Sequence, residues 1–140
     1  PAIVAMSKAL RLALDIKAQK PDHTKNFKHA LIDALGTYEK VTIYSEGEDY
    51  APHILCFSLK GIRGEVLVHA LEEKQIFIST TSACSSRKHM ASSTLHAMHV
   101  PNDLATSAVR ISLDESNSMA EVEQFMIIFK QLYKKFSTIN

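Results

Sequence analysis

The chain has 140 residues, of which 46% are apolar and 22% charged, and its formal net charge is +1. This length suits one domain with a hydrophobic core and is too short for two. A charge so close to zero argues against a dedicated nucleic-acid-binding protein. No apolar run approaches the roughly 20 residues that cross a bilayer, and no signal pattern opens the chain. We expect neither a membrane nor a nucleic acid as a direct partner.

The two cysteines, Cys56 and Cys84, lie in different sequence settings. They do not suggest the framework of a disulfide-stabilised secreted domain, so we expect a reducing, cytoplasmic location. The chain begins at Pro1 rather than Met. A processed terminus or a piece of a longer polypeptide would each explain this.

The first third of the chain predicts two helices and a strand. Apolar residues at helical spacing predict a helix over residues 2–20, which Pro21-Asp22 interrupts. A second apolar stripe predicts a helix over 27–35, with Gly36 as its C-terminal cap. β-Branched and aromatic residues predict a short strand over 41–44.

The middle of the chain predicts two strands around a helix. The apolar run over residues 53–59 is typical of a buried strand, and Cys56 within it reads as a small buried hydrophobic residue. A helix face runs over 66–71. The triplet Ile76-Phe77-Ile78 predicts a third strand, which leads directly into the segment that contains Cys84.

The last third predicts a short helix near residues 95–98, a strand over 109–113 and a long helix over 122–136. Ser118 and Glu121 have the spacing of a capping box at the start of that long helix. Strands and helices are mixed without strict alternation. We therefore predict one α+β domain over residues 1–140, in which helices cover a small, mainly antiparallel sheet in two layers.

Cys84 is the strongest candidate for chemistry. It lies within Ser79-Thr80-Thr81-Ser82-Ala83-Cys84-Ser85-Ser86-Arg87-Lys88, a run of small polar residues followed by positive charge. A cysteine acts as a nucleophile in its thiolate form, which nearby cations favour. Most lone cysteines are buried hydrophobic residues, but this polar setting favours an exposed, reactive thiol at Cys84.

Arg110 is the second candidate, because it interrupts an apolar strand between Val109 and Ile111. Alternation along a strand would allow it to lie on an exposed face. A partly enclosed arginine would instead offer a fork of donors that matches a carboxylate. The residues themselves leave both interpretations open.

A metal site is the weaker hypothesis. His96 and His99 could share a helix face, with His89 and Cys84 upstream. Structural zinc sites usually have closely paired ligands, such as two cysteines two to four residues apart, and that pattern is absent from the sequence. We therefore expect no metal.

Four motifs in register resemble one family. They are residues 51–59, the Gly61-Ile62-Arg63-Gly64 turn with the helix after it, the Ser-Ala-Cys-Ser-Ser core around Cys84, and the strand that contains Arg110. Together they resemble the C-terminal, small domain of NifS/IscS-type cysteine desulfurases, which are pyridoxal-phosphate enzymes of the class V aminotransferase family. The resemblance covers essentially the whole chain.

The resemblance implies a reaction and two site residues. Such enzymes convert L-cysteine to L-alanine and leave a persulfide on a loop cysteine, which passes sulfur to an acceptor for iron–sulfur assembly or tRNA thiolation. Cys84 matches that cysteine, and Arg110 matches the arginine that binds the substrate carboxylate. The cofactor-binding lysine, histidine and aspartate belong to a large domain upstream, through which family members chiefly dimerise. We therefore expect no cofactor bound to this chain alone.

The sequence departs from the family pattern at three places. Thr81 stands where glycine is common, which predicts a stiffer loop because threonine avoids positive φ. Cys56 stands where asparagine is usual. Asp114 and Glu115 replace a Gly-Arg pair. Two other functions stay open: a non-catalytic sulfur carrier or docking module, and a degenerate relative that retains the fold without the activity.

Overall fold

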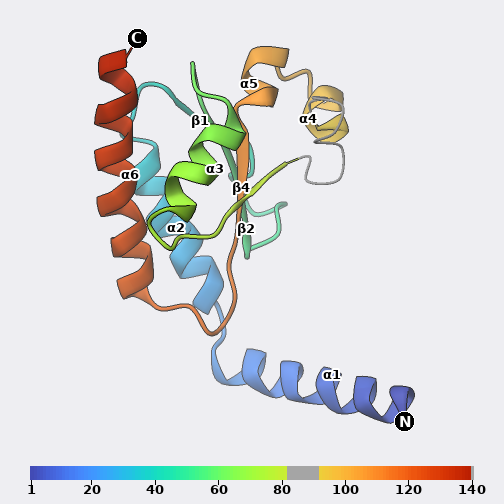
Figure 1. Cartoon of the computed structure of the whole chain (residues 1–140). Coiled ribbons are helices and arrows are strands. Elements are labelled where there is room, and N and C mark those ends of the chain that lie inside the picture. The colour runs from blue at the N-terminus through green and yellow to red at the C-terminus, as the bar shows by residue number, and fades with distance from the viewer. Residues whose placement is uncertain (82–91, 140) are drawn as a thin grey trace.

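A computed structural model describes residues 1–81 and 92–139 (Figure 1). The order of its helices and strands confirms the α+β class. In chain order these elements are α1 (Ala2–Gln19), α2 (His23–Leu35), β1 (Val41–Ile43), β2 (Ile54–Leu59), α3 (Gly64–Glu72), β3 (Ser79–Thr80), α4 (Ser93–Ala97), α5 (Asn102–Thr106), β4 (Ala108–Ser112) and α6 (Met119–Ile139). Among the described residues, no helix combines the length and apolarity needed to cross a membrane.

The sheet has four strands in the order β1-β2-β4-β3, and each of its pairings is antiparallel. The strand predicted over residues 76–78 is wrong in position, because β3 comprises Ser79 and Thr80. Pairing with β4 extends over Ser79↔Arg110 and Thr80↔Val109. Ile76 and Ile78 pack against the core, whereas Phe77 is 73% exposed. Ile76 and Ile78 are therefore apolar because they pack against the core, and not because they pair with another strand.

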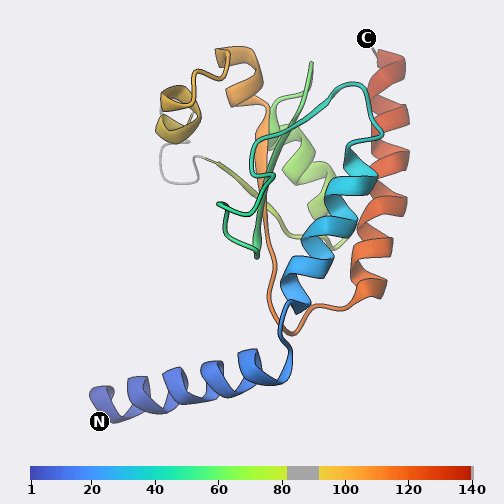
Figure 2. The ribbon, with the colours of Figure 1, turned by 180° about the vertical axis from the view of Figure 1, so that it is seen from behind.

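Helices α2, α3 and α6 pack on one face of the sheet, as the views from both sides show (Figures 1 and 2). The centre of this core is Phe129 of α6, which is fully buried. Its ring packs edge-on against Phe57 of β2 and Tyr38, and lies roughly parallel to Phe125. The predicted apolar stripe of the long C-terminal helix is thus the stripe that meets the sheet.

The two short helices α4 and α5 lie against the opposite face of the sheet. Leu95 of α4, Ala105 of α5 and Ala108 of β4 form a second, smaller buried cluster. Tyr44 and Cys56 pack against its edge. Helix α5 was not among the predicted elements, because a helix of five residues has too few positions to display a helical period.

The capping box at the start of α6 is confirmed. The N–H of Ser118 donates to Glu121 Oε2 at 2.7 Å, and the N–H of Glu121 donates to Ser118 Oγ at 3.3 Å. Gly36 is the C-cap of α2, as predicted, and its N–H donates to the carbonyl of Ile32. Gly64 begins α3 so close to β4 that an added Cβ would lie 2.7 Å from the carbonyl oxygen of Ala108.

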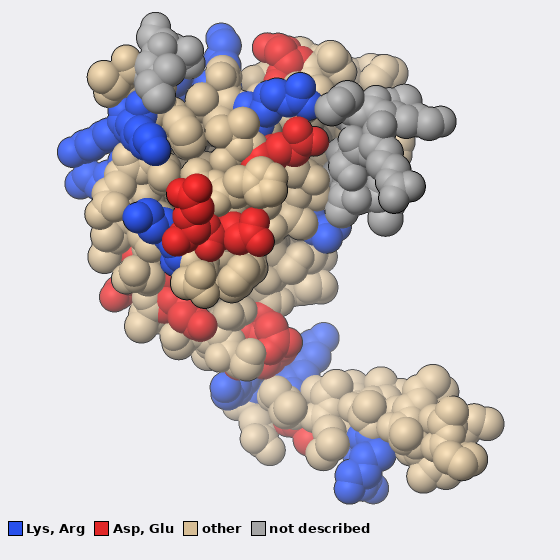
Figure 3. Space-filling view, viewed as in Figure 1, with Lys and Arg blue, Asp and Glu red and all other residues tan. Residues whose placement is uncertain are grey.

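Helix α1 extends away from the rest of the domain and buries none of its residues (Figures 1 and 2). Its apolar side chains include Ile3 at 76% and Leu10 at 61% exposure. Uncharged residues form most of its visible surface (Figure 3). The accessible surface of 9317 Å² also exceeds the roughly 7,250 Å² expected of a compact monomer of this mass. The predicted helix is present, but its apolar stripe has no partner within the described residues.

Candidate functional site

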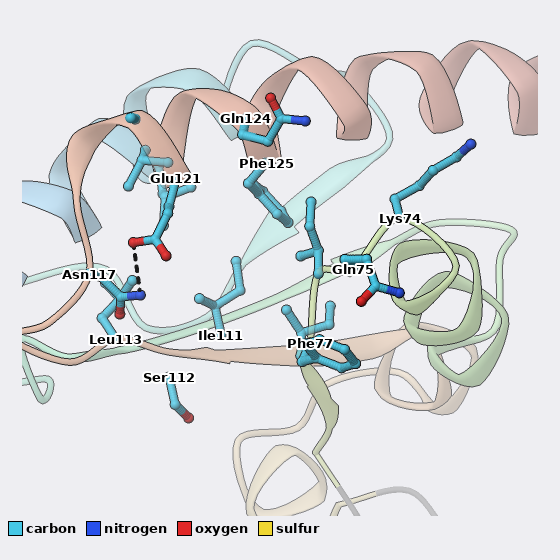
Figure 4. A pocket seen from close by; sticks show the side chains of 15 residues that line it. Lys74, Gln75, Phe77, Ile111, Ser112, Leu113, Asn117, Glu121, Gln124 and Phe125 are labelled. Carbon is cyan, nitrogen blue, oxygen red and sulfur yellow. Dashed lines mark hydrogen bonds between the residues drawn. The ribbon is translucent and has the colours of Figure 1, made fainter.

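Arg110 lies at the middle of β4, on the face of the sheet opposite α2, α3 and α6. Antiparallel pairing sets it directly between Cys56 of β2 and Ser79 of β3. Its neighbours Val109 and Ile111 point into the main core, because successive side chains of a strand alternate between faces. Figure 4 shows the same alternation one step further on, where Ile111 and Ser112 point to opposite sides of β4.

Arg110 is exposed, and within the described part of the chain no carboxylate lies within ion-pair distance of its guanidinium. Of the two interpretations that the sequence left open, the exposed face is therefore the one observed. An unpaired guanidinium presents planar donors that can bind a carboxylate with two parallel hydrogen bonds. As far as the described residues show, this face of β4 can thus bind an anion without first breaking an ion pair.

Cys56 is half-buried beside Arg110, which corrects the expectation that it lies wholly in the core. Burial raises the pKa of the Cys56 thiol to about 11, and the nearby positive charge of Arg110 lowers that pKa by less. At neutral pH the thiol is therefore protonated. A protonated thiol is a poor nucleophile, so Cys56 does not suit sulfur chemistry.

Cys84 lies outside the described residues. What the structure describes is the chain that leads to it: β3 begins at Ser79, opposite Arg110, and Thr81 follows β3. Thr81 does not have a positive φ. A backbone of that kind does not require glycine at this position. The roles of Cys84 and Arg110 remain predictions.

Asp114 has a structural role in the turn between β4 and α6. Its Oδ1 accepts the N–H of Ser116 at 2.9 Å, and its own N–H donates to Asn117 Oδ1 at 2.8 Å. Hydrogen bonds from the Ser116 side chain and backbone lower the pKa of Asp114. Asp114, which stands in place of the glycine of the Gly-Arg pair, is therefore part of a hydrogen-bonded turn that leads into the capping box.

The histidines do not form a metal site in the part of the chain that the structure describes. There, no three His, Cys, Asp or Glu side chains lie close enough to hold a metal ion together. His96 belongs to α4 and His99 follows it with a positive φ of 58°. His89 lies outside the described residues.

A pocket of about 630 Å³ opens where the chain before β3 separates from the end of β4 (Figure 4). Phe125, Ile111 and Leu113 line it with apolar groups, and Glu121 stands at one end beside Asn117. The Glu121 carboxylate is already used by the capping box. The lining also includes the polar side chains of Lys74, Gln75 and Gln124, so the cavity is mixed in character and lies on the face of the sheet opposite Arg110.

Sequence reasoning found Arg110 but missed its pairing with Cys56. Both residues were recognised inside strands, and both strands were predicted. The missing information was the register, which depends on contacts between strands far apart in the chain. A one-residue shift of β4 would have turned Arg110 into the core, so burial of Val109 and Ile111 is what fixes its exposure.

Comparison with known proteins gives the class of this domain. Residues 1–125 match the aminotransferase class-V family, so the chain belongs to that family. A "NifS/IcsS protein homolog" of Lactobacillus delbrueckii subsp. bulgaricus is 49% identical over 140 residues. A "Cysteine desulfurase IscS" of Vibrio cholerae is 33% identical over 138 residues.

Each of these alignments covers 99% of this chain, and respectively 36% and 34% of the relative. The chain thus spans about a third of the length of the curated relatives it matches. A solved structure described as a "NIFS-LIKE PROTEIN" superposes with a TM-score of 0.77 at 26% identity, covering 97% of this chain and 33% of that one. The apo structure of a cysteine desulfurase from Thermococcus onnurineus, at 21% identity and a TM-score of 0.60, shares the fold.

Proposed function

We propose that this chain is the sulfur-accepting part of a pyridoxal-phosphate-dependent cysteine desulfurase. The observation that carries the proposal is Arg110, an exposed guanidinium without a carboxylate partner among the described residues, in the strand next to the one that leads to Cys84. The names of the relatives and the family match support the same reaction class.

In this proposal Arg110 binds the carboxylate of L-cysteine and fixes the orientation of its reacting bond. The Cys84 thiolate attacks the substrate sulfur, so that an S–S bond forms as the C–S bond breaks. The electron pair of the broken bond goes to the substrate carbon, which takes up a proton and becomes the methyl group of L-alanine. Bound pyridoxal phosphate would supply the electron sink for this cleavage.

We propose that this chain does not hold pyridoxal phosphate by itself. Among the described residues Lys28 is the buried lysine, and its Nζ donates to the carbonyl of Ala51 at 3.0 Å. Burial lowers the pKa of Lys28, but this ammonium is committed within the fold and belongs to α2, on the far side of the sheet from Arg110. We propose that the cofactor is held by the part of the enzyme that this chain does not span.

Helix α1 also supports the proposal that another part of the enzyme holds the cofactor. Its exposed apolar side chains need a covering surface, and the excess of about 2,000 Å² over a compact monomer is more than the roughly 800 Å² that one partner buries in a standard protein interface. We propose that α1 packs against the cofactor-binding part of the full-length enzyme. We further propose that the full-length enzyme is a cytoplasmic homodimer. It would transfer sulfur to an iron–sulfur scaffold or to a tRNA-thiolation enzyme.

A chimeric enzyme tests the proposed reaction. This chain would replace the matching third of the Vibrio cholerae relative, and the chimera is expected to release L-alanine from L-cysteine. Cys84→Ala and Arg110→Gln should abolish the release while leaving the circular dichroism spectrum and unfolding midpoint unchanged. Undiminished release by the Cys84→Ala chimera would contradict the proposal.

A second function is a sulfur carrier that receives sulfur from another protein. The observation that favours it is that α2, α3, α6 and the sheet share one hydrophobic core within the described residues. The two functions differ in one result. A carrier takes up sulfur from a donor enzyme on Cys84, yet supports no release of L-alanine in the chimera.

A further inference from the structure

The side chains of Cys56 and Arg110 form a close pair across β2 and β4. The carbonyl of Cys56 accepts the N–H of Tyr44 at 2.9 Å, and its N–H donates to Ser45 Oγ at 2.8 Å. The backbone of Cys56 is therefore directed toward β1. Cys56↔Arg110 is consequently a non-hydrogen-bonded pair, the type in which Cα atoms lie about 4.5 Å apart and side chains are closest.

A hydrogen bond at the end of the ladder gives the same assignment independently. The N–H of Leu113 donates to the carbonyl of His53 at 2.8 Å. Hydrogen-bonded and non-hydrogen-bonded pairs alternate along an antiparallel ladder. Counting back from Leu113, Arg110 again falls on a non-hydrogen-bonded pair with β2, and its backbone groups are directed toward Ser79 of β3.

Cys56 is held in place on its own face of the sheet. It packs against the second buried cluster, in which Leu95, Ala105 and Ala108 are each at most 3% exposed. A short side chain supported in this way has little freedom to move. Its thiol is also uncharged at neutral pH, so it forms no ion pair with the neighbouring arginine.

We infer that Cys56 is a positioning residue for Arg110: its side chain, held by the second cluster, packs against the aliphatic part of Arg110 and fixes the point from which the guanidinium binds a carboxylate. This inference rests on the proposed role of Arg110. It also explains what a cysteine does at a position where asparagine is usual. An uncharged thiol packs beside Arg110 without accepting hydrogen bonds from its guanidinium, whereas the amide oxygen of an asparagine could accept from it.

Kinetics of the chimeric enzyme and nuclear magnetic resonance of the chain provide the test. In the chimera, Cys56→Ala is expected to raise the KM for L-cysteine about three- to tenfold with little change in kcat, because a freed arginine must be immobilised on binding. The heteronuclear NOE of Arg110 Nε should fall in the same variant before any ligand is added. Cys56→Val, which restores apolar contact, should retain both properties.

Ser112→Ala is the matched control, since Ser112 lies two positions along β4 on the same face as Arg110 and is exposed. It should leave the KM and the NOE unchanged. Wild-type KM and NOE in Cys56→Ala would overturn the positioning role while leaving the proposed function intact. A chimera in which Arg110→Gln releases L-alanine at the wild-type rate would instead overturn the carboxylate site and this inference with it.

Discussion

The two faces of the sheet differ in what their side chains contact. On one face Phe57, Val109 and Phe129 are completely buried among α2, α3 and α6. On the other face, beyond the small cluster under α4 and α5, Arg110 is exposed and Cys56 half-buried. β4 contributes to both faces, with its residues alternating between them.

Because of this difference, alternate residues of β4 have different roles: those on the packed face stabilise the fold, and Arg110 lies on the open face. Burial on the packed face fixes the register, and the register in turn sets Arg110 between Cys56 and Ser79. The open face therefore obtains its geometry from residues that never contact a ligand. Changes on the packed face should act on folding, whereas changes on the open face should act on binding and reactivity with little effect on folding.

Phe129→Ala should produce the largest effect on stability. The ring is fully buried and lies within 6 Å of Phe57, Phe125 and Tyr38, measured between ring centroids. Removing a buried phenylalanine costs about 3–5 kcal/mol, because apolar contact is lost and a cavity remains. Urea unfolding followed by circular dichroism measures the loss. A cost below about 1 kcal/mol, the median for arbitrary substitutions, would mean that α6 does not anchor the packed face.

The reactivity of Cys56 should be low, although it lies on the open face. Its pKa of about 11, against an ordinary value of 9.0, leaves roughly a hundredfold less thiolate at pH 8 than in the unfolded chain. Alkylation by iodoacetamide, measured in a Cys84→Ser background, should therefore be about a hundredfold slower in buffer than in urea. Equal rates would show that Cys56 is not sheltered by the second cluster.

The capping box should give a smaller effect that depends on pH. Ser118→Ala should cost about 1 kcal/mol at pH 7, the typical value for loss of an N-cap side chain. The backbone N–H of Ser118 lowers the pKa of Glu121 below its ordinary 4.5. A lowered folded-state pKa stabilises the fold above pH 4.5, and that contribution is lost as the pH falls through the folded value. Urea midpoints of Glu121→Gln and wild type should therefore converge in acid; a constant difference from pH 7 to pH 3 would contradict this.

Much of the fold followed from local sequence patterns, and the exceptions depended on distant contacts. The stripe of α6 and the capping residues Ser118 and Glu121 were predictable because they lie within one helix. The triplet over residues 76–78 resembled a strand, but the pairing with β4 begins only at Ser79. The stripe of α1 predicted a helix correctly, yet periodicity carries no information on which surface covers it.

The candidate site was predictable to the same extent. Arg110 was found because a charge inside an apolar strand is conspicuous, and Cys84 because its neighbours are small and polar. The exposure of Arg110 and its pairing with Cys56 needed the register of the sheet. Cys84 lies outside the described residues, so its role is best tested by chemistry.

The most direct test asks which of the two cysteines accepts sulfur. The chimera of this chain with the Vibrio cholerae relative would be incubated with L-cysteine, digested without reductant, and analysed by tandem mass spectrometry. The account predicts a mass gain of one sulfur atom on Cys84, none on Cys56, and no gain on this chain in Cys84→Ser. Sulfur on Cys56, or a chimera in which Cys84 takes up none, would contradict it.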